Sequence, residues 1–304
     1  MSLPREHSAV PLAWLNGEFL PFAEARLSIV DYGIAQGATV TERLRTFQHQ
    51  PVWLEEHLDR LEQSLALVDW LGVPGREQLR QAVHALVQHN TVLIPAEADL
   101  AVVLFITPGL FPPDAVTLGQ PLGIPTVCIY STPLPQQQWE PLYRSGVHLW
   151  TPEIRQIPAA CVDPRIKHRS RLHWHLADRQ IRQQDPLGVA LLLDERGYVT
   201  ETSSANLFLV NAGRLYTPKP ETTLPGITQA KVSQLAESLE LTVARGNFTA
   251  VDLQEADEAF LTSSTFLVLP ATQCNRQLIG DGLPGPITRQ LSAALNDQLG
   301  ASTR

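Results

Sequence analysis

Cysteine, charge and long apolar runs are all scarce in this sequence. The three cysteines, Cys128, Cys161 and Cys274, stand far apart and form no CxxC pair, which fits a reduced intracellular protein better than a disulfide scaffold. The N-terminal stretch MSLPREHSAVPLAW lacks the apolar segment of a secretion signal. Nowhere do about 18 apolar residues follow one another without interruption. We therefore expect no membrane span and a cytoplasmic protein.

Positive charge is scarce as well. The 304 residues carry a formal net charge of −8, and no basic stripe interrupts that balance. A nucleic-acid binder needs a surface that neutralises phosphates, so this class of protein is excluded. Hydrophobic residues make up 44% of the chain, which is enough to bury a substantial core and favours about two domains.

Hydrophobic periodicity in the first half predicts two strand pairs, two helices and a buried strand. Residues 14–20 (WLNGEFL) predict short strands around an Asn-Gly turn, and 40–54 predict a second pair that turns near His49-Gln50-Pro51. Helices are predicted over 54–71, ended by Gly72 and Pro74, and over 76–90; the strand spans 100–107. One apolar face is expected along the first helix: Leu54, Leu58, Leu61, Leu65, Val68 and Leu71.

A change of composition marks the expected domain boundary. Residues 108–140 are rich in proline, glycine and glutamine, and PLPQQQ predicts a linker at 133–138 between a small domain (1–132) and a large domain (139–304). The second half is predicted to contain a strand near 146–151, a helix over 169–184, a β-meander (VALLL, YVTE, NLFLV, LYT), a helix over 227–240 and a last helix. Strands and helices mix in both halves, which indicates an α/β or α+β fold class.

The sequence contains neither a dinucleotide-binding motif nor a metal-binding motif. No GxGxxG follows a predicted strand, which argues against a dinucleotide-binding fold. HRSRLHWH (168–175) holds three histidines but no carboxylate or cysteine partner at ligand spacing, so we expect no metal site.

Five features stand in one order along the chain: HLDRL (57–61), Lys167, Glu201, Asn206 and LPGIT (224–228). ETSSANLF (201–208), LYT (215–217) and LPGIT resemble the signature of the class IV pyridoxal-phosphate aminotransferases. DYGIAQGATVTERLR (31–45) resembles that family's N-terminal glycine motif, and GDGLPGPIT (280–288) its C-terminal turn. Lys167 lies 34 positions before Glu201, which is the family's spacing from Schiff-base lysine to acidic residue. The chain departs at Gln229, where the family prefers lysine or arginine.

The resemblance implies a two-domain fold with a barrel-like sheet in the larger domain, and pyridoxal 5'-phosphate held by Lys167 as a Schiff base. A lysine that attacks an aldehyde must be deprotonated part of the time, and the arginines of RIKHRSR favour this. The lysine released by substrate can then move a proton from the substrate Cα. Glu201 would keep the pyridine nitrogen protonated. Asn206 is expected to position backbone near Glu201.

The phosphate needs positive charge and backbone donors. Gly226, Ile227 and Thr228 open a predicted helix, whose free N–H groups and dipole suit an anion. Arg60 is assigned to the phosphate by the same resemblance, the alternative being a surface salt bridge to Glu56 or Asp59. His57 is expected to be a packed helix histidine.

A serine- and threonine-rich turn supplies the other expected contacts. By the same resemblance, Ser264 and Thr265 in LTSSTF align with the loop that binds the phosphate and the substrate carboxylate. The alternative is a turn without a ligand.

The expected substrate pocket contains Gln36, Thr41, Glu42 and Leu172, and it does not name one substrate. Branched-chain enzymes place aromatics at Gln36 and Thr41, and polar groups there suit a branched aliphatic side chain poorly. Glu42 is typical of the branched-chain and D-amino-acid aminotransferases, whereas Leu172 within KHRSRL is typical of the aminodeoxychorismate lyases.

The group that binds the substrate carboxylate is also left open. D-amino-acid enzymes and lyases carry an arginine where this chain has Pro108. The alternatives for this role are Arg43, Arg45 and the backbone at Ser264–Thr265.

The resemblance implies a transaminase that acts on amino acids and 2-keto acids and forms a homodimer, with active sites that borrow residues from the partner. Pyridoxal-phosphate-dependent elimination is the alternative reaction. A non-catalytic family member is disfavoured because Lys167 and Glu201 are both present.

Overall fold

The computed structural model describes residues 9–119 and 123–302. The chain divides into two compact units. The first comprises the described part of Met1–Leu134 together with Ile166–Ser170, and the second comprises Pro135–Arg165 and Arg171–Ser302. The sequence assigned Ile166–Ser170 to the large domain, whereas this short segment packs with the first unit. The stretch 133–138 holds the last residue of one strand and the first turn of a helix.

The first unit is built on a six-stranded antiparallel sheet in the order β2-β1-β6-β5-β3-β4. Its strands are β1 (Leu12–Leu15), β2 (Glu18–Pro21), β3 (Val40–Phe47), β4 (Gln50–Pro51), β5 (Leu100–Thr107) and β6 (Thr126–Pro133). β6 lies inside the proline- and glycine-rich stretch in which the sequence predicted no strand. It nevertheless pairs with both β1 and β5, because the centre of the sheet supplies partners that local composition does not reveal.

The hairpins β1–β2 and β3–β4 both turn at residues with positive φ. Asn16 and Gly17 join β1 to β2 with φ of 50° and 104°, as the Asn-Gly pair predicts. The second turn uses Gln48 and His49, whose φ values are 48° and 62°, so Gln50 and Pro51 belong to the strand β4. The turn therefore begins one residue earlier than the proline suggested.

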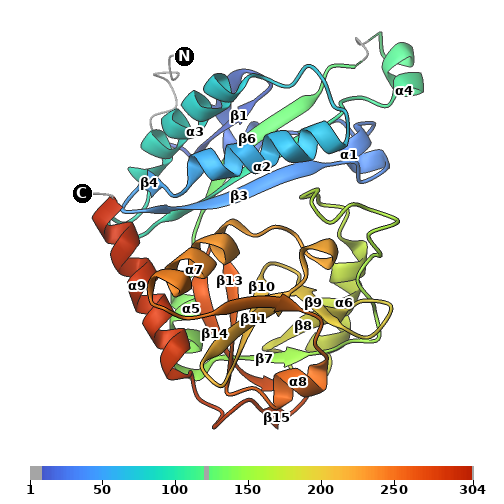
Figure 1. The fold of residues 1–304 in the computed structure, drawn as a ribbon. Helices are drawn as coiled ribbons and strands as arrows, with labels where there is room; N and C mark the ends of the chain where they lie inside the picture. Colours follow the sequence, from blue (N-terminus) through green and yellow to red (C-terminus); the bar gives the residue numbers. More distant parts are fainter. Residues whose placement is uncertain (1–8, 120–122, 303–304) are drawn as a thin grey trace. The chain divides into compact units, whose positions relative to one another are not determined.

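Helices α2 (Leu54–Leu67) and α3 (Arg76–Thr91) cover one face of this sheet (Figure 1). Leu58 and Leu61 of α2 and Leu86 of α3 are almost fully buried against strand residues. The first helix is shorter than predicted, since Asp69 takes the left-handed conformation with φ of 53°. Val68 caps the helix and Leu71 is 78% exposed, so Leu71 is not part of the buried face.

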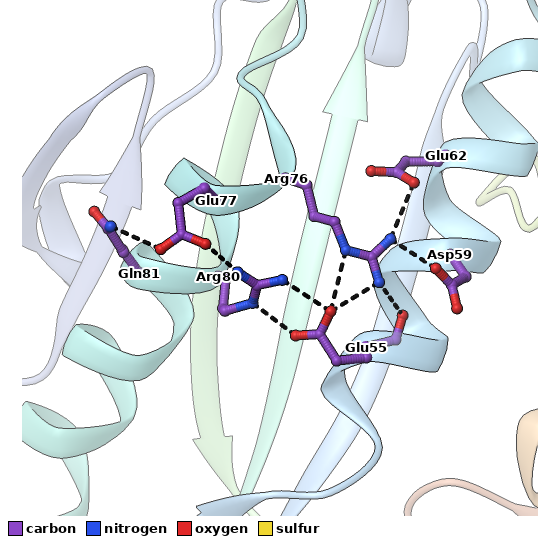
Figure 2. Close-up of polar contacts among 7 residues, drawn as sticks. All are labelled: Glu55, Asp59, Glu62, Arg76, Glu77, Arg80 and Gln81. Atoms are coloured by element: carbon purple, nitrogen blue, oxygen red, sulfur yellow. Dashed lines mark hydrogen bonds and ion pairs between the residues drawn. The ribbon is translucent and has the colours of Figure 1, made fainter.

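On their solvent side, α2 and α3 are linked by a network of ion pairs (Figure 2). Arg76 contacts Glu55, Asp59 and Glu62, and Arg80 contacts Glu55 and Glu77. The hydrogen bonds from Arg80 and Arg76 lower the pKa of Glu55 to about 2. The network fixes the start of α3 against α2, although each exposed pair alone contributes little.

The first unit also contains two short helices and a 3-10 turn: α1 (Tyr32–Ala35), α4 (Pro112–Thr117) and η2 (Phe22–Glu24).

The second unit contains a nine-stranded, curled, barrel-like sheet in a mixed α/β fold. Its strands run β12-β11-β10-β13-β14-β7-β8-β9, and β15 pairs with β14. Their bounds are β7 (Val147–Trp150), β8 (Gly188–Leu193), β9 (Val199–Thr202), β10 (Asn206–Asn211), β11 (Arg214–Pro218), β12 (Val243–Gly246), β13 (Glu258–Ser263), β14 (Leu267–Cys274) and β15 (Gln277–Leu278). The predicted meander is therefore divided: β8–β9 and β10–β11 are separate hairpins, and β10 pairs with β13 instead of β9.

The sheet of the second unit is accompanied by five helices in the described residues: α5 (Gln136–Ser145), α6 (Leu172–Arg182), α7 (Ile227–Ser238), α8 (Ala250–Gln254) and α9 (Pro286–Ser302), with a 3-10 turn η3 (Pro220–Thr222) (Figure 1). Helix α6 begins at Leu172, three residues after the predicted start. Phe208 and Phe260 stack at 5.1 Å between centroids within the buried part of the sheet. Within the described residues, no helix is both long and apolar enough to cross a membrane.

Candidate active site

Lys167 is held against β3 by backbone contacts within the first unit. Its carbonyl accepts a hydrogen bond from the Thr41 N–H at 2.8 Å, and its own N–H donates to Ser64 Oγ at 3.2 Å. Two residues further on, the Arg169 N–H donates to Thr39 Oγ1 at 2.7 Å. The segment that carries Lys167 is therefore fixed by β3 and α2 together.

Glu42, on the helix-covered side of β3, is fully buried and bonded to two residues of α2. Its carboxylate accepts from Arg60 Nε and Nη2, each at 2.7 Å, and from His57 Nδ1 at 2.7 Å. Arg60 is thus paired with Glu42 inside the first unit. Burial alone would raise the pKa of Glu42, but Arg60 and His57 together hold it well below its usual range.

His57 is a buried, neutral member of the same cluster. Burial is the main cause that lowers its pKa, and the cations of Arg60 and Lys167 act in the same direction against the opposing effect of Glu42. Since Nδ1 donates to Glu42, we assign the lone pair to Nε2. Nε2 is buried and has no hydrogen-bond partner among the described residues.

Three other pocket candidates differ in their exposure. Thr41 is buried, and its hydroxyl donates to the Leu104 carbonyl at 2.7 Å. Gln36 caps the C-terminus of α1 and is exposed, and Leu172 is 71% exposed at the first position of α6.

In the second unit, Glu201 lies at the end of β9 and is held by three donors. Gln156 Nε2 donates to its Oε1 at 3.2 Å, while Asn206 Nδ2 and the Leu224 N–H donate to its Oε2, each at 3.2 Å. Asn206 also donates to the Leu224 carbonyl at 2.9 Å, so its side chain links Glu201 to the backbone of the LPGIT turn. This linkage fixes the Glu201 carboxylate against the backbone at Leu224.

The N-terminus of α7 has no side-chain cap. Gly226 is its N-cap and provides no side-chain cap, and a Cβ there would lie only 1.9 Å from Asn206 Oδ1. Beyond Ile227, the hydroxyl of Thr228 is buried and has no partner among the described residues. A helix N-terminus with an unpaired buried hydroxyl can accept an anion.

Helix α9 has a similar sequence at its start but a different arrangement. There the carboxylate of Glu258 accepts from the N–H groups of Ile287 and Thr288, at 2.9 and 2.8 Å, and from Thr288 Oγ1 at 2.7 Å. The chain supplies its own anion to α9, whereas none among the described residues is bonded to the Thr228 hydroxyl in α7.

The serine- and threonine-rich turn lies between β13 and β14. Ser263 Oγ and Thr265 Oγ1 are 3.2 Å apart, Ser264 is half-buried, and the hydroxyl of Thr262 is buried without a partner among the described residues. Thr262 belongs to the same LTSSTF stretch but was not among the site residues expected from the sequence.

Two glutamines of the second unit bind neighbouring side chains. Gln156 contacts Glu201 from a loop that carries no motif. Gln229, the departure from the family pattern, is 2% exposed and donates to Thr217 Oγ1 at 2.8 Å. It anchors α7 to β11 through a neutral hydrogen bond.

The fold and this arrangement define a class of protein: a two-unit α/β protein that shares its fold with solved aminotransferases. Over 95% of this chain and 94% of the other, it matches a T.th. branched-chain amino acid aminotransferase solved with pyridoxamine 5'-phosphate, with a TM-score of 0.83 and 26% identity. The family model described as amino-transferase class IV matches residues 39–274. The chain belongs to the class IV aminotransferase family.

Curated relatives carry two kinds of name. A branched-chain-amino-acid aminotransferase-like protein of Arabidopsis thaliana is 31% identical over 96% of this chain, which spans about half (51%) of that relative's length. A putative branched-chain-amino-acid aminotransferase of Methanocaldococcus jannaschii is 28% identical, with 93% of this chain and 95% of the relative covered. A D-alanine aminotransferase of Listeria monocytogenes is 29% identical, with 91% and 92% covered.

Proposed function

We propose that this protein is a pyridoxal-phosphate-dependent aminotransferase that moves an amino group between an amino acid and a 2-keto acid, with Lys167 holding the cofactor covalently. The observation that carries the proposal is the start of α7, where a buried Thr228 hydroxyl has no partner among the described residues and Gly226 leaves the helix end uncapped. The contrast with α9, whose equivalent groups are bonded to Glu258, supports an external anion at α7.

The residues of the second unit suit the cofactor's other polar groups. A phosphate at α7 would accept from the backbone N–H groups of Ile227 and Thr228 and from the Thr228 hydroxyl. Glu201 is the carboxylate we assign to the pyridine nitrogen, and Asn206 and Gln156 fix its orientation. Ser264 and Thr265 are assigned to the phosphate and the substrate carboxylate.

Lys167 is the residue we assign to proton transfer. When bound, pyridoxal phosphate supplies a sink for the electron pair left on the substrate Cα. The Lys167 amine takes the proton from that carbon and returns it, and the contacts of Lys167 with Thr41 and Ser64 hold its backbone in place for this.

In the first unit, we assign Arg60 to the phosphate of the cofactor. Glu42 holds its Nε and Nη2 in one orientation, and His57 holds Glu42 in turn. Glu42 and His57 are therefore positioning residues in this proposal.

The test is to load the purified protein with pyridoxal phosphate, add single amino donors and follow the cofactor's absorbance. We expect conversion to the amine form and its reversal by a 2-keto acid. If no donor in a broad panel converts the cofactor, the proposal is wrong. Release of pyruvate and aminobenzoate from aminodeoxychorismate, without such conversion, would assign the lyase reaction instead.

We also propose that the enzyme works as a homodimer in the cytoplasm. Closed two-fold pairs are the commonest oligomers, and the family resemblance implies active sites shared between partners. The three unpaired cysteines support a reducing compartment. Light scattering should give twice the chain mass of 33.6 kDa, and a fully active monomer would exclude the dimer.

A further inference from the structure

The turn between β9 and β10 lies between two residues of the candidate site. Glu201 precedes the turn on β9, and Asn206 follows it as the first residue of β10. The Thr202 N–H and hydroxyl both donate to the Ala205 carbonyl, at 2.9 and 3.1 Å, which closes the turn at residues 202–205. A shift of the 202–205 turn therefore moves the backbone that carries Glu201 and Asn206.

The strand that carries Glu201 is short. β9 contains four residues and stands last in the strand order of its sheet, where β8 is its ladder partner. The register between these two strands shifts between Leu191 and Leu193. A short strand at the end of a sheet has a ladder neighbour on one side, so contacts from outside the ladder help to set the position of Glu201.

Helix α6 supplies such contacts at Ser203. Arg171 Nη2 donates to the Ser203 carbonyl, and the Ser203 hydroxyl donates to the Asp178 carboxylate. Arg171 is the N-cap of α6 and Asp178 lies seven positions later, about two helical turns, so both reach the same side of the helix. The backbone and the side chain of Ser203 are thus bonded to one helix.

The helix itself is firmly packed. Its buried residues Trp174, Ala177 and Ile181 pack against Ala190 and Leu192 of β8. The Arg171 guanidinium lies 5.8 Å from the centre of the Trp174 ring, which restricts the direction of that side chain. Helix α6 is therefore a rigid support for the 202–205 turn.

Asp178 is partly removed from water. Burial raises its pKa, against the opposing effects of the Arg182 cation, the Ser203 hydroxyl and the Arg171 cation. A carboxylate that has lost part of its hydration binds the remaining donors more strongly, so the contact with Ser203 holds the turn better than an exposed hydrogen bond would.

We propose that Arg171 and Asp178 are positioning residues for Glu201, because by holding Ser203 they set the direction of the carboxylate assigned to the pyridine nitrogen. This inference rests on the proposed aminotransferase function. Arg171 follows Lys167 by four positions, so one continuous stretch of chain carries the lysine assigned to the cofactor and anchors the turn next to Glu201. Hydrogen bonds at a reacting centre lose much of their effect when they are displaced by a fraction of an ångström.

A labelled cofactor reports on Glu201 directly. With pyridoxal phosphate that is isotopically labelled at the pyridine nitrogen, nitrogen NMR distinguishes a protonated ring from an unprotonated one. We expect a protonated ring in the wild-type protein and a shift toward the unprotonated signal in Asp178→Ala and Arg171→Gln, because a displaced carboxylate stabilises the proton less. Single-turnover amino transfer should slow about tenfold in each variant, while the Kd of the cofactor changes less than about twofold.

A conservative variant and a matched control separate positioning from folding. Asp178→Asn keeps an oxygen that accepts from the Ser203 hydroxyl, so it should restore most of the nitrogen signal and of the rate. Ser203→Ala removes the same hydrogen bond from its other end and tests it even if Asp178→Ala does not fold. Arg179→Gln changes an exposed residue of the same helix and the net charge by the same amount as Arg171→Gln, and it should leave signal and rate unchanged.

The outcomes distinguish this inference from the proposed function. If the wild-type ring is protonated and the variants keep both the nitrogen signal and the rate, the inference alone is overturned. Variants that lower the urea midpoint but leave the nitrogen signal unchanged would give Arg171 and Asp178 a purely structural role, which also overturns it. An unprotonated ring in the wild-type protein, or no amino transfer with any donor, would refute the proposed function and the inference with it.

Discussion

The guanidinium of Arg60 and the carboxylate of Glu42 form a two-pronged ion pair inside the first unit, with Nε–Oε1 and Nη2–Oε2 distances of 2.7 Å each. Glu42 is fully buried, and Arg60 is 6% exposed. The pair joins β3 to α2. Glu42 directly follows Thr41, whose N–H donates to the Lys167 carbonyl. It therefore links the stability of this unit to the position of the site.

We expect Glu42→Gln to destabilise the cofactor-free protein by about 3 kcal/mol, because it removes the carboxylate charge that binds two nitrogens of the buried Arg60 guanidinium. The measurement is the urea midpoint of the first unit's unfolding. Glu42→Asp, which keeps the charge, should recover part of the loss. A midpoint within experimental error of the wild type would show that the pair is not a stabilising contact.

The same cluster predicts acid sensitivity. The pKa of Glu42 is lowered from 4.5 and that of His57 from 6.5 in the folded protein. Both groups therefore contribute stability above their unfolded pKa values, and it is lost as the pH falls below about 6.5 for His57 and about 4.5 for Glu42. In Glu42→Gln the loss below pH 4.5 should be shallower, and an unchanged pH profile would contradict this assignment.

The exposed network on α2 and α3 should behave differently (Figure 2). Arg76→Gln removes contacts with Glu55, Asp59 and Glu62 that are open to solvent, so we expect a smaller shift of the urea midpoint than Glu42→Gln gives. Salt screens exposed pairs, so the shift should shrink further in 1 M salt. A loss that equals that of Glu42→Gln and resists salt would be inconsistent with this expectation.

Lys167 should be the only attachment point of the cofactor. The sequence contains three lysines, Lys167, Lys219 and Lys231, so borohydride reduction followed by peptide mapping gives an unambiguous answer. Lys219→Ala and Lys231→Ala are the matched controls and should retain the reduced label. Label on either of these residues, or none at all, would remove Lys167 from its role.

Thr228 and Thr288 form a matched pair for the phosphate proposal. Thr228→Val should weaken pyridoxal phosphate binding about tenfold without destabilising the cofactor-free protein, because the lost hydroxyl has no partner among the described residues. Thr288→Val breaks the bond to Glu258 and should cost about 1 kcal/mol of stability without changing the cofactor affinity. Fluorescence titration and thermal unfolding measure the two effects, and the reverse pattern would place the anion elsewhere.

Glu201→Gln should separate cofactor binding from reaction. The amide keeps the size of the carboxylate but loses its charge, so pyridoxal phosphate should still bind while single-turnover amino transfer slows by about a hundredfold or more. Gln156→Leu removes one donor to Glu201 and should give a smaller decrease. Near-normal single-turnover rates in Glu201→Gln would show that the pyridine nitrogen has another partner.

Local sequence determined several elements of the fold. The Asn16-Gly17 turn, the helix α3 and the strand β5 were predicted with nearly their observed bounds, because each depends on backbone preferences or on a regular apolar pattern within a few residues. The family was also predicted from sequence, since the spacing of its motifs survives where overall identity is near 30%.

Tertiary contacts decided the rest. β6 takes a central place in its sheet in spite of its composition, and the predicted meander is split because β10 finds its partner in β13, about fifty residues away. Ile166–Ser170 packs with the first unit because β3 and α2 supply the partners of its backbone and side chains. Only the fold could show that Arg60 pairs with Glu42. Ion-pair partners depend on which side chains meet in space, and these two residues lie 18 positions apart in the sequence.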